Sequence, residues 1–412
     1  MKMSFEPVRG TEDYLPKQME LREYVKSQIL KTYKKYGFMQ IGTPILENIN
    51  LLLGSDGGDN LKLIFKVLKR GEKLDLTKPE LTERDIVDLG LRYDLTVPMV
   101  RMFCNNQNSL PVPFKSIQID YSFRADRPQR GRGRQFIQCD IDILGDPTCN
   151  AEIDILNTTA KTFMALEFEN FEIKLNDRRI LSSIIAFAGF AKEEEKEICV
   201  CLDKLDKIGV DGVAEEMISR GFDANNVQKL MGIVVVLQQK GIESLKDYGV
   251  DKALIDEVQK VLASVNALSG GKYVAKYDIS IVRGQGYYTG MVYEFYMPSF
   301  RGACAGGGRY DNMVENLTGK SVPAVGLGLG FEPTCLLFAE RNGKVLSAKN
   351  IAVLYRPEDN FVDVLRFIDS LDGNVNGSAI LAKKNIGFQL KTLKENGYTH
   401  FCMFAEKNIK EI

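Results

Sequence analysis

The sequence predicts an α+β protein: a strand-rich core with helices on its flanks, a helical insertion and a small C-terminal α/β unit. Three observations predict it. Phe114–Phe123 and Phe136–Leu144 are largely apolar, strand-forming segments. Lys192–Val265 interleaves charges around apolar stripes at helical spacing and contains no strand clusters. From Ile351 to Ile412 strand-like and helix-like segments alternate.

The first part of the chain predicts a long helix and then short strands. Gln18–Tyr36 has apolar residues at helical spacing, and Gly37 is a plausible stop signal. Phe38–Ile45 follows as a short strand. Ile86–Met102 and Phe114–Phe123 read as strand-forming segments that bracket a proline-rich turn.

After the helical block, strand character resumes through Tyr277–Met297, and the glycine-rich segment Gly302–Gly308 follows. Ala324–Glu332 alternates glycine with apolar residues, as expected of a strand that crosses closely under a ligand or another element. Glu340–Asn350 is charged and reads as a linker.

Composition excludes several function classes. Fifty-four basic and 55 acidic residues give a net charge of −1, so no global field draws the protein to polyanions. The single histidine, His400, argues against His-based acid–base catalysis and multi-His metal sites. The eight cysteines are scattered and are expected to be reduced thiols. Apolar runs are too short for a membrane span, so we expect a cytoplasmic protein without membrane contact.

The most informative segment is an arginine loop between two predicted strands. Residues 124–134 contain five arginines with glycines among them. Arginine forks bind phosphate or carboxylate in pairs of hydrogen bonds, and glycines permit close approach to a polyanion. The alternative is a solvated basic hairpin. No P-loop or dinucleotide fingerprint is present, so a phosphate site would be of another type.

The strand after this loop carries polar residues on one face. Gln138, Asp140 and Asp142 recur at period two, opposite Ile141 and Ile143. Two interpretations remain open: a solvated sheet face, or the floor of a binding site whose carboxylates face a cationic group.

Five ordered segments resemble the histidyl-tRNA synthetase family, a class II aminoacyl-tRNA synthetase family. They are Arg9–Asp13, Leu91–Pro98, the arginine loop 124–134 as motif 2, and the two histidine-specific motifs Arg283–Gly290 and Gly306–Asp311. The resemblance covers most of residues 5–337.

The resemblance implies a class II catalytic sheet of six antiparallel strands flanked by helices. It implies a catalytic core in two parts, 1–189 and 269–345, around a helical insertion at 190–268. A C-terminal α/β domain at 346–412 is similar to an anticodon-binding domain but shorter. The family also implies a homodimer, with segments near residues 40–100 at the interface.

The implied chemistry has two steps: L-histidine and ATP, used with Mg²⁺, form histidyl-adenylate, and the histidyl group then passes to tRNA(His). Carried over residue by residue, Arg124 and Arg283 are similar to the catalytic arginines on either side of the α-phosphate. Asp126 and Arg132 join Arg124 in binding ATP, and no resident metal site is implied.

Histidine itself is bound, by the same resemblance, through two groups of residues. Asp94, Thr96 and Gln138 are similar to those that hold the ammonium group. Asp142, Tyr287 and Tyr288 match positions that read the imidazole ring. At the positions of Asp126 and Asp142 the family more often has glutamate.

Two departures leave a second reading open. Pro333 stands where class II enzymes nearly always have a γ-phosphate-binding arginine, and Gly286 stands where the family usually has aspartate. The arginine-rich loop favours a ligase. Pro333 and the short C-terminal domain favour a synthetase-like regulatory subunit that partners the catalytic subunit of ATP phosphoribosyltransferase.

Overall fold

The computed structural model describes residues 5–54, 58–77, 79–282, 287–341, 349–373 and 375–412. The chain forms two compact units: residues 25–341 together with those up to Glu12, and residues 13–24 together with 342–412. Helix α1 (Pro16–Lys35) begins in the second and continues into the first. Each unit is described on its own. No described helix is long and apolar enough to pass through a bilayer.

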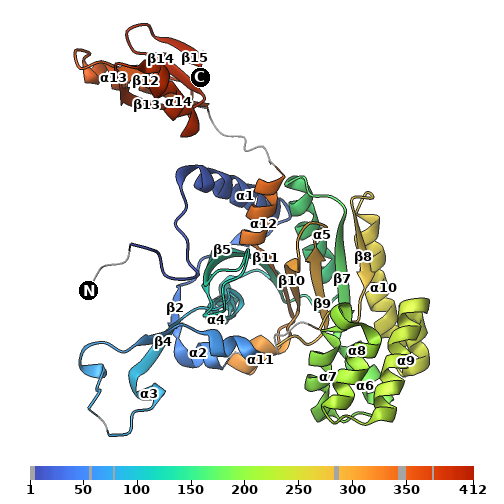
Figure 1. Ribbon diagram of the computed structural model, residues 1–412. Helices are drawn as coiled ribbons and strands as arrows, with labels where there is room; N and C mark the ends of the chain where they lie inside the picture. Colours follow the sequence, from blue (N-terminus) through green and yellow to red (C-terminus); the bar gives the residue numbers. More distant parts are fainter. Residues whose placement is uncertain (1–4, 55–57, 78, 283–286, 342–348, 374) are drawn as a thin grey trace. The chain divides into compact units, whose positions relative to one another are not determined.

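The first unit is built on an eight-stranded sheet of order β1-β5-β6-β11-β10-β9-β7-β8 (Figure 1). Its six central strands pair antiparallel, and the edge strands β1 and β8 join in parallel. The implied six-stranded antiparallel sheet is therefore the centre of a larger one. The strands are β1 (Met39–Gln40), β5 (Phe114–Phe123), β6 (Gln135–Leu144), β7 (Phe171–Asp177), β8 (Tyr273–Tyr277), β9 (Met291–Tyr296), β10 (Ala303–Arg309) and β11 (Ala324–Gly330).

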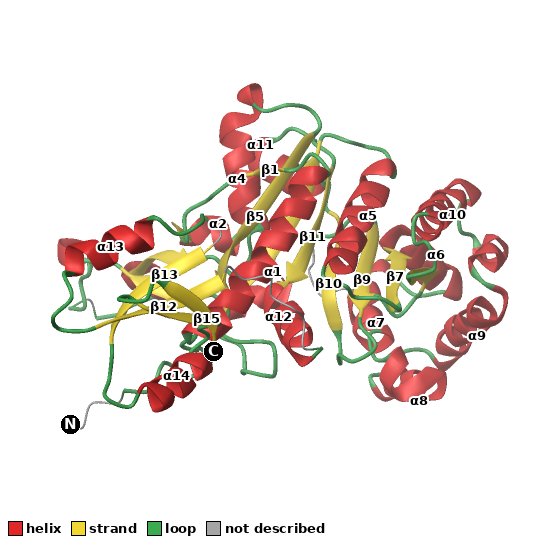
Figure 2. Ribbon diagram, turned by 90° about the horizontal axis from the view of Figure 1, so that it is seen from above, coloured by secondary structure: helices red, strands yellow, loops and turns green. Residues whose placement is uncertain are grey.

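Helices connect these strands, and the chain between β7 and β8 is helical, as its charge pattern predicts. Figure 2 shows this block gathered beyond β7. It consists of α6 (Arg178–Ala188), α7 (Glu195–Leu202), α8 (Leu205–Ser219), α9 (Ala224–Lys240) and α10 (Lys252–Ala267). The remaining helices of this unit are α2 (Ile49–Leu53), α3 (Glu83–Ile86), α4 (Thr96–Asn106), α5 (Asn150–Ala165), α11 (Asn312–Thr318) and α12 (Phe331–Glu340).

The segment Ile86–Met102 corrects the sequence prediction. Its first half is strand β4 (Val87–Leu91), which pairs antiparallel with β2 (Leu46–Asn48) and β3 (Lys66–Leu68) in a separate small sheet. Its second half begins helix α4, not a strand. Phe38–Ile45 also forms less strand than predicted, because β1 contains two residues.

The alternation of β6 separates core from cavity. Ile137, Cys139, Ile141 and Ile143 are buried, and the Tyr33 hydroxyl of α1 donates to the Cys139 carbonyl at 3.3 Å. Because side chains alternate along a strand, the polar residues between them all face the other side of the sheet.

The second unit has a four-stranded sheet of order β13-β12-β14-β15, in which β15 alone among its described strands runs antiparallel to its neighbour. Leu354 and Leu393 pack on one side of the sheet, and Val353 and Val364 pack together in a separate cluster. The elements are β12 (Lys349–Tyr355), α13 (Phe361–Asp369), β13 (Val375–Leu381), α14 (Ile386–Glu395), β14 (His400–Met403) and β15 (Asn408–Glu411).

Candidate active site

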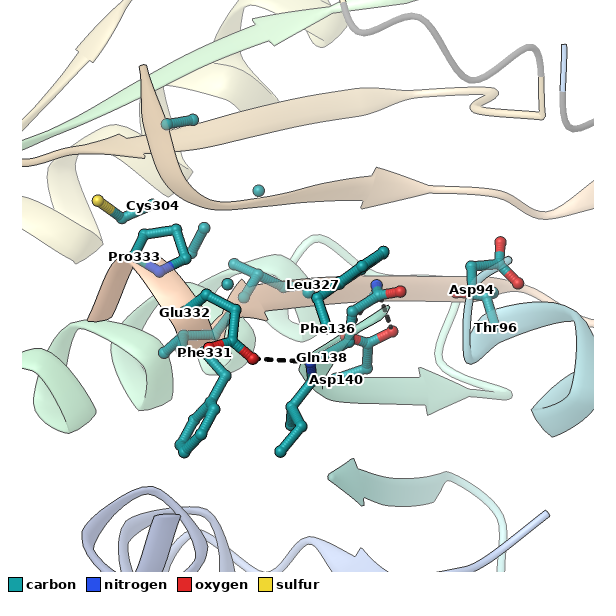
Figure 3. Close-up of a pocket in the computed structure, with 18 of the residues that line it drawn as sticks. Asp94, Thr96, Phe136, Gln138, Asp140, Cys304, Leu327, Phe331, Glu332 and Pro333 are labelled. Atoms are coloured by element: carbon teal, nitrogen blue, oxygen red, sulfur yellow. Dashed lines mark hydrogen bonds between the residues drawn. The ribbon is translucent and has the colours of Figure 1, made fainter. Parts of the chain in front are cut away.

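A cavity of about 290 Å³ lies over β6, β10 and β11. Figure 3 shows Asp94 and Thr96 at one end and Glu332 and Pro333 at the other. Every predicted site residue that the structure describes lines it, and Arg283 lies outside the described residues. The lining residues among them are Asp94, Thr96, Arg124, Asp126, Arg132, Gln138, Asp142, Tyr287 and Tyr288.

Glycines of β11 make room for the carboxylates of β6. Gly326 is in register with Asp142, and Gly328 with Asp140. A Cβ atom at Gly326 would lie 2.0 Å from Asp142 Oδ1, and one at Gly328 would lie 2.9 Å from Asp140 Oδ1. The glycine alternation therefore marks a strand over which another strand's side chains lie, one of the two readings that the sequence offered.

Asp142 forms a buried hydrogen-bonded pair with Tyr310, a residue not predicted from the sequence as part of the site. The Tyr310 hydroxyl donates to Asp142 Oδ1 at 2.5 Å. Burial raises the pKa of Asp142 to about 7, and the hydrogen bond from Tyr310 lowers it in part. The Tyr310 ring meets the Tyr287 ring edge-on, with centroids 5.9 Å apart. The signal for Tyr310 was its place in the motif Gly306–Asp311.

In that same motif, Arg309 has a structural role. Its guanidinium forms a buried ion pair with Glu152 of α5 at 2.6 Å. It also donates to the carbonyls of Asp146 and Thr148. Arg309 therefore fixes the end of β10 against α5.

Asp94 precedes helix α4 and faces the cavity. The Val97 amide donates to Asp94 Oδ1 at 3.2 Å, which fixes the side chain at the start of the helix. Asp94 Oδ2 is buried and has no hydrogen-bond partner in the described part of the chain. Burial raises the pKa of Asp94 to about 6, against the lowering effects of the Val97 amide and Arg124.

Asp140 and Gln138 complete the polar floor. Gln138 Nε2 lies 3.4 and 3.3 Å from the two oxygens of Asp140. Burial and the nearby Asp142 and Asp94 raise the pKa of Asp140 well above its usual range. Asp140 lines the cavity, as the binding-floor interpretation of this strand predicted, although the family resemblance carried no individual role over to it.

The other end of the cavity carries the arginine loop. Arg124 Nε donates to the Tyr93 carbonyl at 2.8 Å, and its guanidinium carbon lies 5.2 Å from the Phe136 ring centroid. Gln129 and Arg132 exchange backbone hydrogen bonds, which makes the loop a tight hairpin. Asp126 and Arg132 are exposed at the cavity wall.

Helix α12 closes this arginine end. Pro333 is its third residue, and a Cβ at Gly131 of the hairpin would lie 3.8 Å from Pro333 Cα. Glu332 Oε1 accepts a hydrogen bond from the Ile137 amide at 3.2 Å. The cavity thus joins buried carboxylates, which suit a cation, to arginines, which suit a phosphate, and Arg124 lies close enough to Asp94 and Asp140 to lower the pKa of both.

Comparison with known proteins gives consistent matches. The family model described as histidyl-tRNA synthetase matches residues 10–333. The histidine–tRNA ligase of Leifsonia xyli is 39% identical over 340 residues, which are 79% of this chain and 78% of that protein. The histidine–tRNA ligase of Cytophaga hutchinsonii is 35% identical over 341 residues, 79% of this chain and 74% of that protein.

Two solved structures share the fold. Histidyl-tRNA synthetase from Nostoc sp. PCC 7120 superposes with a TM-score of 0.77 at 23% identity, covering 97% of this chain and 91% of that one. An ATP phosphoribosyltransferase regulatory subunit/histidyl-tRNA synthetase from Bacillus halodurans gives a TM-score of 0.77 at 18% identity, covering 98% and 99%.

Proposed function

The chain belongs to the histidyl-tRNA synthetase family, and from this premise we propose that it is a cytoplasmic aminoacyl-tRNA synthetase that ligates L-histidine to tRNA(His) with ATP. One observation carries the proposal. A single cavity joins buried carboxylates, which suit an ammonium and an imidazole N–H, to an arginine loop, which suits a nucleotide phosphate.

In the first step, a carboxylate oxygen of histidine attacks the α-phosphorus of ATP. The bond from that phosphorus to the bridging oxygen breaks, and pyrophosphate leaves. Arg124 stabilises the charge that develops on the α-phosphate, and Arg283 is proposed to act with it. In the second step, a hydroxyl of the terminal ribose of tRNA attacks the histidyl carbonyl carbon, and AMP leaves.

Histidine is proposed to lie over the carboxylate end. Asp94, Thr96 and Gln138 receive its ammonium group. Asp142 accepts from one ring N–H, while Tyr287 and Tyr288 bound the ring. This orientation points the substrate carboxylate toward Arg124 and the arginine loop, where Asp126 and Arg132 are proposed to hold ATP.

Mg²⁺ is proposed to enter with ATP. Among the described residues no group of three or more His, Cys, Asp or Glu side chains is arranged to hold a metal ion. Mg²⁺ commonly keeps waters and binds substrate phosphates with few protein ligands, so a metal carried by the nucleotide would need few ligands from this chain.

The tRNA partner is supported by a basic, aromatic surface on the second unit. Phe388 of α14 is 64% exposed. Lys383, Lys384 and Lys391 are exposed nearby in the sequence. Unpaired bases stack on exposed aromatic rings beside cationic groups, so this surface suits single-stranded RNA.

The test is histidine-dependent exchange of labelled pyrophosphate into ATP, followed by charging of tRNA(His). Exchange with histidine and not with other amino acids is expected. A second function, the regulatory subunit of ATP phosphoribosyltransferase, is favoured by Pro333 at the phosphate end. Retained histidine binding without exchange, together with co-purification of the transferase's catalytic subunit, would establish that function instead.

A further inference from the structure

Asp140 is a buried carboxylate to which the proposed reaction assigns no role. It lies at the middle of β6, 3% exposed, between Gln118 of β5 and Gly328 of β11 in the sheet register. Within the described ranges no lysine or arginine forms an ion pair with it. Burying an unpaired carboxylate is unfavourable, so its retention in the cavity needs a reason.

Among the described residues, the hydrogen-bond partner of the Asp140 side chain is Gln138. The two Asp140 oxygens lie 3.4 and 3.3 Å from Gln138 Nε2, as the dashed line in Figure 3 shows. In its ionised form the Asp140 carboxylate accepts hydrogen bonds and cannot donate, so it then fixes which end of the amide faces it. The other end, Gln138 Oε1, is buried and without a partner in the structure as described.

Asp94 Oδ2 is a second acceptor in the same cavity that is buried and has no hydrogen-bond partner among the described residues. Two buried acceptors without donors among the described residues, in one cavity, suit a ligand group with several N–H bonds. An ammonium group has three. A turned amide would instead present its NH₂ group to the ammonium and repel it.

We propose that Asp140 is a positioning residue of the ammonium subsite: it holds the Gln138 amide so that Oε1 accepts a hydrogen bond from the α-ammonium of the amino acid. The inference rests on the proposed function, because it takes histidine as the ligand. The raised pKa of Asp140 fits this role, since an arriving cation offsets the burial of its charge.

The experiment compares two ligands by calorimetry: L-histidine, and imidazole-4-propionate, which is the same molecule without the ammonium. Asp140→Asn is expected to weaken histidine binding by about 10- to 100-fold, as for a hydrogen bond to a charged group. Binding of imidazole-4-propionate should change by less than about threefold. Asp203→Asn, at an exposed position in the helical block, is the matched control.

A double-variant cycle tests whether Asp140 acts through Gln138. In a Gln138→Ala background, Asp140→Asn should weaken histidine binding by less than about threefold, because residues that act as a unit are not additive. Asp140→Leu, which can neither donate nor accept, is the second variant. Asp140→Asn and Asp140→Leu both remove a buried charge. Their unfolding temperatures should therefore equal or exceed that of the wild-type protein.

Equal losses for both ligands, no loss for either, or additive losses in the cycle would overturn the inference and leave the proposed function intact. Absence of histidine binding by the wild-type protein would overturn the proposed function, and this inference with it.

Discussion

Gly326 makes room for Asp142 at the carboxylate end of the cavity. A Cβ there would lie 2.0 Å from Asp142 Oδ1 and 3.1 Å from the Tyr310 ring. Gly326→Ala is therefore expected to displace Asp142, break its hydrogen bond with Tyr310 and weaken histidine binding by about tenfold or more. Calorimetric titration with histidine measures this.

Substitutions at two other glycines serve as controls for Gly326→Ala. A Cβ at Gly307 would lie 1.9 Å from the Gly326 carbonyl oxygen, so Gly307→Ala strikes backbone and should prevent normal folding. Gly232 in α9 has nothing within 4 Å of its Cβ position, so Gly232→Ala should stabilise by about 0.5–1 kcal/mol. Wild-type histidine affinity in Gly326→Ala would contradict the packing described.

Asp142 also predicts how stability depends on pH. Its pKa is about 7 in the folded chain and near 3.8 when unfolded. Between these values the folded protein binds more protons than the unfolded chain, so the free energy of unfolding falls as pH rises from about 4 to 7. Asp94 and Asp140 contribute with the same sign.

Asp142→Asn should remove the part of this decrease in the free energy of unfolding that Asp142 contributes. Relative to wild type, the variant gains about 2 kcal/mol of stability between pH 5 and pH 8. Thermal unfolding of both proteins at the two pH values measures the gain, and saturating histidine should reduce it. An equal pH slope in the two proteins would show that Asp142 titrates normally.

At the scale of elements, we expect helix α12 to tolerate an arginine at position 333. Pro333 is in the first turn, where the backbone N–H has no partner within the helix. Pro333→Arg should therefore fold normally. By adding a cation at the end of the cavity where ATP is proposed to bind, it should raise the rate of pyrophosphate exchange about tenfold or more.

Pro333→Ala is the matched control, because it removes the proline ring without adding charge. Exchange no faster in Pro333→Arg than in Pro333→Ala would mean that a cation at this position does not reach the phosphates. Absence of pyrophosphate exchange in the wild-type protein and in both variants, with histidine still bound, would favour the regulatory function.

The elements also show what a sequence can predict. Phe114–Phe123 is a strand over its whole predicted length. The polar face of β6 lines the cavity, in agreement with the interpretation of this face as the floor of a binding site. The prediction of a strand where α4 begins was wrong. Val97, Met99 and Val100 are all buried, so no polar face in the sequence indicated a helical period. Like α12, that helix carries a proline as its third residue.

Contacts between distant strands were beyond prediction. Tyr310 and Asp142 lie 168 residues apart in the chain. They meet because β10, β11 and β6 are neighbours in the sheet. Alternation places a side chain on a face, but the strand order decides which side chains share a cavity, and strand order depends on tertiary packing.

At the scale of the molecule, exposed leucines on the small sheet and the helix beside it support the homodimer that the family implies. Leu46 of β2, Leu53 of α2 and Leu68 of β3 are 47%, 39% and 52% exposed. Exposed apolar side chains that form a contiguous patch are typical of a covered surface. We propose that a second copy of the chain covers them.

Leu68→Glu tests the dimer, because a carboxylate placed in an apolar interface loses hydration without gaining a partner. Sedimentation should show a wild-type dimer at micromolar concentration, and the variant should dissociate at least about tenfold more readily. Ile218→Glu in α8, where the isoleucine is 49% exposed, is the control and should remain dimeric. Because the leucines lie outside the cavity lining, a monomeric Leu68→Glu variant that still binds histidine would separate assembly from substrate binding, whereas a wild-type monomer would remove the dimer from the proposal.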